Sequence, residues 1–368
     1  MTNWTGVARV AGVAGVVVAG AAVGLVAEKT VVGKRFRRDP DADERFGSLR
    51  GRFVDVVADD GTHLHVEVDE PALLRDNLTI IFCHGYALNQ DSFHYQRRDL
   101  RALGRLVFWD QRSHGRSQRG NADTANIDQL GRDLAAVVDA VAPVGPVVLV
   151  GHSMGGMTVM AYAHQHPEEF GARVEGVALM ATSASGLVGV PLGLPDAATK
   201  LVTRTAPAFA ASLARNKELI ERGRRASSDL SLLLTNRYSF GSKVSPSLTA
   251  FVAEMLNATP IDVVAEFMPA FTAHDKRDAL VALNRVETLV MVGDADMLTP
   301  EAHGEAIVQR VPGAEYVVLP DTGHMLLLER YPEVNQHLRE LVSRVRRNAA
   351  VAYPATPATP ATPATPDT

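Results

Sequence analysis

One serine lies where a nucleophile would be expected. Ser153 is the centre of the G-H-S-M-G segment at residues 151–155, which follows the apolar run 147–150 and precedes a helical pattern of apolar residues. A tight turn between a strand and a helix holds such a serine strained and exposed, and glycines at both ends leave room where side chains would clash. The helix N-terminus directs its positive end at charge that develops near the serine. We therefore predict that Ser153 is catalytic; the alternative is an inert serine in a glycine-rich turn.

A serine hydroxyl is a poor nucleophile unless a base takes its proton. Among 12 histidines, His324 follows the last predicted strand and precedes a helix that ends near Arg347. A loop histidine there can reach the same sheet edge as Ser153. The base also requires a carboxylate that orients it and stabilises the imidazolium. Asp294 and Asp296 both follow the predicted strand 289–292, and at this point either one fits.

The elements that would position these side chains alternate between strand and helix. Segments 53–57 and 63–68 alternate polar with apolar residues on either side of Asp59-Asp60-Gly61, which predicts a hairpin. Apolar residues in 127–141 have the spacing of one helix face. Six further runs are short and nearly all apolar, which is typical of strands buried on both faces of a parallel sheet. Together these patterns predict an α/β fold with an eight-stranded, mostly parallel sheet and helices on both faces. The six runs are 80–83, 106–109, 147–150, 177–180, 289–292 and 316–319.

One stretch interrupts this alternation. Residues 186–279 contain helical patterns without a convincing buried strand, so we predict a helical cap inserted between two sheet strands. Its apolar first part, 187–195, could line a pocket or pack ordinarily against the core. The predicted core domain then comprises residues 49–185 and 280–348.

Five motifs occur in order along the chain. The first is H-G-Y at 84–86, and the second, at 110–117, is similar to D-x-R-G-x-G-x-S with Ser113 in place of a usual glycine. The others are the G-x-S-x-G segment, G-x-x-D-x-x-x-P at 293–300 and G-H at 323–324. From about Arg52 to about Val345 the chain thus resembles the α/β-hydrolase superfamily, particularly its capped bacterial serine esterases and lipases.

The resemblance implies a serine hydrolase whose catalytic residues follow in the order Ser153, Asp296 and His324. It selects Asp296 over Asp294. It also implies that the backbone N–H groups of Tyr86 and Met154 form the oxyanion hole, where preorganised donors contribute roughly 3 kcal/mol each. The expected reaction is cleavage of a carboxylic ester of an apolar acyl group through an acyl-enzyme. No metal or organic cofactor is expected, and the expected substrate is a small apolar ester or lipid.

Composition and the remaining polar residues give no indication of a nucleic-acid partner, a disulfide or a second catalytic group. The net charge of −5 over 368 residues gives no indication of a nucleic-acid partner. Cys83 is the one cysteine, so no intrachain disulfide can form. We expect His84 to shape its loop through hydrogen bonds and His152 to pack or hydrogen-bond beside the nucleophile. The polar cluster at 110–114 is expected to be structural.

The two ends of the chain differ from the core. Val10 to Ala27 is an uncharged run of 18 residues, which as a helix would span about 27 Å, just short of the roughly 30 Å hydrocarbon layer. Because basic residues follow it up to residue 38, we predict a membrane anchor at 1–38 with the catalytic domain in the cytoplasm. A cleaved signal peptide of a secreted protein and a helix on a soluble protein are the alternatives. Residues 349–368 repeat Ala-Thr-Pro and predict a disordered tail.

Other activities fit the same residues. Cofactor-free haloperoxidases, carbon–carbon bond hydrolases and aminopeptidases share the fold and a serine triad, so the sequence does not separate them from esterases. Haloalkane dehalogenases and epoxide hydrolases use an aspartate nucleophile, which Ser153 disfavours. A non-catalytic binding protein of the same fold is the alternative outside enzymes. Acyl length and oligomeric state stay open.

Overall fold

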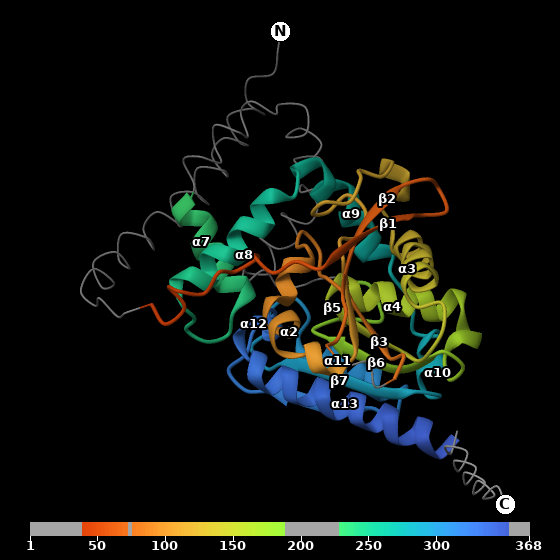
Figure 1. Cartoon of the computed structure of the whole chain (residues 1–368). Coiled ribbons are helices and arrows are strands. Elements are labelled where there is room, and N and C mark those ends of the chain that lie inside the picture. Colours follow the sequence, from red (N-terminus) through yellow and green to blue (C-terminus); the bar gives the residue numbers. More distant parts are fainter. Residues whose placement is uncertain (1–38, 73–75, 188–227, 353–368) are drawn as a thin grey trace, which may run out of the picture. The chain divides into compact units, whose positions relative to one another are not determined.

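Eight strands form one sheet in the order β1-β2-β4-β3-β5-β6-β7-β8 (Figure 1). This computed structural model describes residues 39–72, 76–187 and 228–352. The chain divides into two units, residues 1–43 and 44–368, and the sheet belongs to the second. The prediction of an eight-stranded α/β sheet is confirmed. The strands are β1 (Arg52–Val57), β2 (His63–Asp69), β3 (Thr79–Cys83), β4 (Arg105–Trp109), β5 (Val147–His152), β6 (Val174–Met180), β7 (Glu287–Gly293) and β8 (Glu315–Leu319).

The strand directions bring the predicted site loops to one edge. β2 pairs antiparallel with β1 and β4, and the pairs from β4 through β3 and β5 to β8 are all parallel. Parallel neighbours end at the same edge of a sheet, where sites form in open α/β sheets. Gly151 near the end of β5 lies opposite Cys83 at the end of β3. The loops after β3, β5, β7 and β8 therefore meet.

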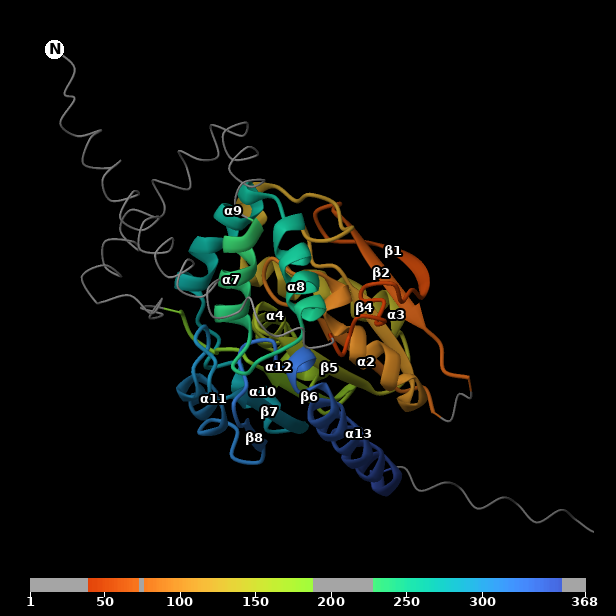
Figure 2. The same ribbon diagram turned by 90° about the vertical axis from the view of Figure 1, so that its left-hand side faces the viewer.

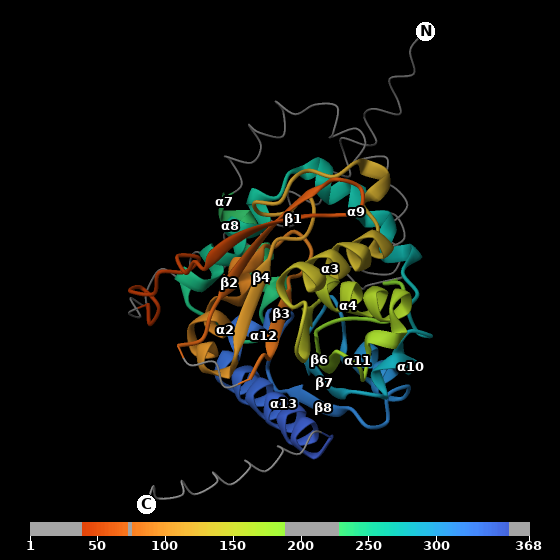
Figure 3. The same ribbon diagram turned by 45° about the vertical axis from the view of Figure 1, so that its right-hand side comes forward.

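Helices cover both faces of the sheet (Figure 3). One face carries α3, α4, α10 and α11, and the other carries α2, α12 and α13. The predicted helix at 127–141 is α3, which begins where the Asn126 side chain accepts the N–H of Gln129, a regular N-cap. The helices are α2 (His94–Asp99), α3 (Ile127–Val141), α4 (Met154–Gln165), α7 (Ser228–Ser239), α8 (Pro246–Ala258), α9 (Ile261–Ala273), α10 (Leu280–Leu283), α11 (Glu301–Val308), α12 (Leu326–Glu329) and α13 (Tyr331–Ala352).

Strand β3 shows why the predicted runs are apolar throughout. Ile81 and Cys83 belong to the core cluster under α3 and α4, and Ile80 and Phe82 belong to the cluster under α13. All four side chains are at most 2% exposed. Because successive side chains of a strand point to opposite faces, a strand covered on both sides has no position for a solvated residue.

The described part of the predicted cap is helical. Residues 188–227 lie outside the described residues, and α7, α8 and α9 follow them (Figure 2). α8 begins at Ser245, whose side chain accepts the N–H of Leu248 at 3.1 Å, with Pro246 in the first turn. That sequence is a strong start signal. The axes of α8 and α9 differ by 89° across Thr259 and Pro260.

The ends of the chain carry two further outcomes. The predicted membrane segment at 1–38 lies outside the described residues. Among the residues that the structure describes, no single helix is long and apolar enough to cross a membrane, and α8 with α9 passes that test as a bent pair. α13 continues to Ala352, past the predicted boundary at 348, because three of the residues 349–352 are alanine, the best helix former, and the first proline follows at 354.

Candidate active site

Ser153 occupies a strained turn between β5 and α4. Its φ is 52° and its ψ is −118°, and a non-glycine residue persists there only when its surroundings hold it. Its N–H donates to the Met180 carbonyl at 2.9 Å, and the Thr182 hydroxyl donates to its carbonyl at 2.7 Å. A Cβ at Gly155 would lie 1.9 Å from the Cys83 carbonyl oxygen. Glycine is therefore required at 155 for α4 to start this close to β3.

Three side chains from different loops form one hydrogen-bonded chain. Nε2 of His324 lies 2.9 Å from Oγ of Ser153, and Nδ1 of His324 lies 2.8 Å from Oδ2 of Asp296. His324 is 7% exposed and Asp296 is 4% exposed. The structure thus brings together the three residues that the sequence predicted as nucleophile, base and orienting acid.

The Asp296 carboxylate accepts hydrogen bonds at both oxygens. Its Oδ1 accepts the N–H groups of Leu298 and Thr299 at 2.8 and 3.0 Å, and Oδ2 accepts the Thr299 hydroxyl at 2.7 Å besides His324. Burial raises the pKa of Asp296, but the charge and hydrogen bond of His324 and the hydrogen bonds from Thr299 outweigh it, so the pKa lies below its usual range. The carboxylate is therefore ionised at neutral pH.

Thr299 is not among the residues predicted from the sequence. Asp296 accepts the N–H of the residue two positions on, as aspartates in turns commonly do, and such a turn brings the Thr299 hydroxyl next to the carboxylate. Asp294, the other candidate carboxylate, accepts the N–H of Thr322 at 3.2 Å. Asp294 thereby supports the turn that precedes His324.

The predicted oxyanion donors lie on two neighbouring segments. Tyr86 lines the same cavity as Ser153, and Met154 is the first residue of α4. Neither N–H donates to an acceptor among the described residues. As expected, His84 hydrogen-bonds within the loop: Nε2 accepts the N–H of Gln111 at 2.9 Å, which leaves the proton on Nδ1 to donate to the Gly85 carbonyl at 2.7 Å.

Buried histidines support the site as neutral groups. Burial lowers the pKa of His84 to about 4, and burial, aided by the neighbouring His324, lowers that of His152 to about 3. Nε2 of His152 donates to the backbone carbonyl of His324 at 2.9 Å. His152 thus packs beside the nucleophile and hydrogen-bonds to the segment that carries His324.

A cavity of about 480 Å³ opens beside Ser153 and His324. The loop at residues 85–88, the predicted oxyanion loop, supplies one wall, and α7 and α8 supply another. Apart from Ser153 and His324, the lining residues with polar side chains are Tyr86, Thr235, Tyr238, Ser239 and Asn257. The remaining lining residues are Gly85, Ala87, Leu88, Leu234, Val252, Leu256, Leu298 and Met325.

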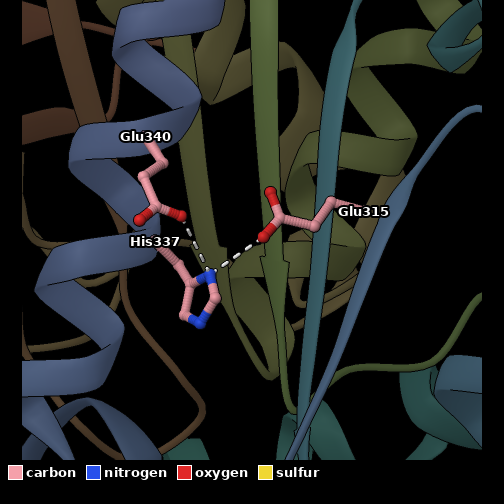
Figure 4. A group of neighbouring side chains, drawn as sticks. All are labelled: Glu315, His337 and Glu340. Atoms are coloured by element: carbon pink, nitrogen blue, oxygen red, sulfur yellow. Dashed lines mark hydrogen bonds and ion pairs between the residues drawn. The ribbon is translucent and has the colours of Figure 1, made fainter.

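One group of potential metal ligands occurs among the described residues (Figure 4). None of its three members lines the cavity. Nδ1 of His337 lies 2.9 Å from Glu315 and 3.6 Å from Glu340. Glu315 begins β8, at the end of the strand opposite to the His324 loop. Because Arg344 already pairs with Glu315 at 2.7 Å, we interpret the group as an ion-pair network that joins α13 to β8.

Comparison with known proteins agrees with the fold. A family model described as the alpha/beta hydrolase fold matches residues 79–331, and the chain belongs to this family. The AB hydrolase superfamily protein YisY of Bacillus subtilis is 28% identical over 70% of this chain and 88% of that protein. A non-heme haloperoxidase of Rhodococcus erythropolis is 30% identical over 78% of this chain and 98% of that protein.

Solved structures give the same result for the fold. An esterase from Thermogutta terrifontis matches with a TM-score of 0.62 at 24% identity, over 80% of this chain and 99% of that chain. A bromoperoxidase from Bacillus anthracis matches with a TM-score of 0.63 at 20% identity, over 79% of this chain and 100% of that chain. The family membership supports a hydrolase of this fold.

Proposed function

We propose that this protein hydrolyses carboxylic esters of apolar acyl groups through an acyl-enzyme on Ser153. The observation that carries the proposal is the hydrogen-bonded chain of Ser153, His324 and Asp296 on the wall of a largely apolar cavity. A hydroxyl next to a histidine whose other ring nitrogen contacts a buried carboxylate is activated as a nucleophile at neutral pH.

In the first step, Oγ of Ser153 attacks the acyl carbon while Nε2 of His324 takes the hydroxyl proton. Asp296 keeps the proton on Nδ1 of His324 and stabilises the imidazolium that forms. The N–H groups of Tyr86 and Met154 donate to the oxyanion. His324 then gives its proton to the leaving alcohol oxygen, and the acyl group stays on Ser153.

In the second step, water replaces the alcohol. Nε2 of His324 takes a proton from the water as its oxygen attacks the acyl carbon. Collapse of the intermediate releases the carboxylic acid, and Ser153 recovers its proton from His324. The two steps consume one ester and one water.

The cavity supports an apolar acyl group. Its volume of about 480 Å³ is within the range of small-molecule sites, which are mostly apolar with a few polar groups. Leu234, Val252, Leu256 and Leu298 contribute its aliphatic surface. Burial of that surface against an acyl chain contributes roughly 25 cal/mol per Å², which favours acyl chains over polar substituents.

The test is covalent labelling of the full chain with a fluorophosphonate, together with turnover of p-nitrophenyl esters from acetate to palmitate. Ser153→Ala and His324→Ala should abolish labelling and lower kcat by about 10⁴-fold or more. Ser183→Ala is a matched control, because Ser183 Oγ also contacts a histidine, His303, at 2.8 Å but is buried at 1% exposed.

Ser183→Ala should be labelled by the fluorophosphonate and should turn over ester like the wild type. If the folded wild type is not labelled, Ser153 is not an activated nucleophile and the proposal is wrong. Labelling without turnover of any ester would retain the nucleophile and reject the substrate class.

A second candidate activity is perhydrolysis, which is favoured by similarity to a non-heme haloperoxidase over 78% of this chain and, over 26% of this chain, to a protein named bifunctional esterase/perhydrolase. Hydrogen peroxide would attack the same acyl-enzyme in place of water and release a peracid with free Ser153. Adding peroxide to the ester assay distinguishes the two activities. Peracid formation that exceeds hydrolysis at millimolar peroxide would favour this candidate.

A further inference from the structure

The loop that carries the predicted oxyanion donor contains a strained residue. The N–H of Leu88 donates to the Gly85 carbonyl at 3.2 Å, which closes a turn with Tyr86 and Ala87 at its centre. Ala87 has a φ of 56°. A turn with positive φ at its third position normally has glycine or asparagine there, so the alanine needs external support.

The core holds one side of this turn. The Gly85 carbonyl accepts from both Nδ1 of His84 and the N–H of Leu88. The Gly85 carbonyl and the Tyr86 N–H belong to one planar trans peptide, so they point in opposite directions. Fixing the carbonyl toward the core therefore aims the N–H away from it.

The cap holds the other side. The hydroxyl of Thr259, in the turn between α8 and α9, donates to the Ala87 carbonyl at 3.0 Å. The hydroxyl of Tyr86 donates to the Val264 carbonyl in α9. The Tyr86 ring meets that of Phe271 edge to face at a centroid distance of 4.8 Å. Thr259 is 6% exposed, so water does not readily replace its hydroxyl at Ala87.

We propose that Thr259 and the Tyr86 hydroxyl are positioning residues that latch the oxyanion loop to the cap and keep the Tyr86 N–H aimed at the oxyanion. The inference rests on the proposed function. The two bonds hold consecutive residues, Tyr86 and Ala87, on the side that His84 does not reach. Without them, Ala87 relaxes from its strained conformation and the Gly85–Tyr86 peptide rotates.

The latch affects the transition state more than substrate binding. The ester carbonyl needs the Tyr86 N–H most when negative charge develops on its oxygen. Loss of the latch should therefore lower kcat with little change in KM, whereas loss of cavity wall would raise KM.

The experiment replaces hydroxyl groups without changing side-chain volume. Thr259→Val should lower kcat about tenfold with KM within about twofold, and Thr259→Val with Tyr86→Phe should lower it about 100-fold. Thr259→Ser keeps the hydroxyl and should therefore retain most of the wild-type activity. Thr249→Val is the matched control, since Thr249 is also 6% exposed on the cap but its hydroxyl donates to the carbonyl of Ser245, the N-cap residue of its own helix, at 3.2 Å.

Hydrogen exchange tests the latch apart from catalysis. Peptides that cover residues 84–90 should exchange faster in Thr259→Val than in wild type or Thr249→Val. Wild-type exchange and wild-type kcat in Thr259→Val would overturn the proposal, as would equal losses in Thr249→Val. If Thr259→Val exchanges faster but the wild type turns over no ester, the latch is supported and ester hydrolysis is rejected. Failure of the latch and failure of the proposed function are therefore distinguishable.

Discussion

At the scale of single residues, the hydrogen bonds around Asp296 determine which ring nitrogen of His324 carries a proton, and the proposed reaction requires that Nε2 be free to take the proton of Ser153. Oδ2 of Asp296 accepts from both Nδ1 of His324 and the Thr299 hydroxyl. A hydroxyl has one proton, so Thr299, which also lies 3.3 Å from Nδ1, donates to the carboxylate. Nδ1 therefore keeps its proton, and Nε2 presents a lone pair to Ser153.

We predict that Asp296→Asn lowers kcat by about 10³–10⁴-fold, because an amide can donate to Nδ1 and select the wrong tautomer of His324. Asp294→Asn is the matched control and should stay within about threefold of wild type, because Asp294 bonds to a backbone N–H in the neighbouring turn. Steady-state kinetics with p-nitrophenyl butyrate measures both. A larger loss of kcat in Asp294→Asn than in Asp296→Asn would show that Asp294, and not Asp296, orients His324.

At the scale of elements, α8 presents one face to the cavity. Val252 and Leu256 are four residues apart on this helix, so they lie on the same face, and both line the cavity. The N-cap at Ser245 and the turn at Thr259 fix both ends of the helix. Under the proposed function, the side chains that α8 presents help to set the length of acyl chain that fits the cavity.

We predict that Leu256→Phe shifts the preference toward shorter esters, because the larger ring occupies part of the cavity. The ratio of kcat/KM for palmitate to that for butyrate should fall at least about tenfold, since each buried methylene contributes about 0.8 kcal/mol. Ile261→Phe, on α9 at a residue 40% exposed and outside the cavity lining, should leave the ratio unchanged. An unchanged ratio in Leu256→Phe would show that the acyl chain lies elsewhere.

At the scale of the whole molecule, buried neutral histidines couple stability to pH. Burial lowers the pKa of His84 to about 4 and those of His114 and His152 to about 3. The unfolded chain would titrate them near 6.5. Below pH 6.5 the unfolded state binds more protons than the folded state, so the stabilisation that is complete above 6.5 is lost as the pH falls toward 3–4.

We predict that the free energy of unfolding in urea falls between pH 6.5 and 4.5. The slope should be up to about 1.4 kcal/mol per pH unit for each of the three histidines. His114→Gln should give a shallower slope, because one group no longer titrates. A flat profile down to pH 4.5, with a fall only at lower pH, would attribute acid unfolding to carboxylates instead.

The strands show which structural features can be predicted from local sequence. The predicted runs 80–83 and 147–150 lie inside β3 and β5, because continuous apolar character records burial on both faces. The strands extend beyond these runs, since β3 begins at Thr79 and β5 ends at His152. These polar residues are fully buried in the sheet and pair through the backbone, which a hydrophobicity pattern does not record.

The predicted site also contains features that local sequence indicates and one choice that it does not. The glycine pattern around Ser153 and the positions of Asp296 and His324 after strand ends are local features, readable from the chain, and the structure places these side chains within hydrogen-bond distance. Their catalytic roles stay predictions. The residues alone left Asp294 and Asp296 equivalent, and the resemblance to a family was needed to choose.

The sequence pattern is sufficient for the strands and for the nucleophile turn, because apolar period and the space that glycine provides act over a few residues. It is insufficient for the cavity and for the contacts of the oxyanion loop. Thr259 and Ala87 are 172 positions apart, and Tyr86 and Val264 are 178 apart. Such contacts depend on how the cap packs over the sheet edge, which is set by the sum of many side-chain contacts rather than by any one segment.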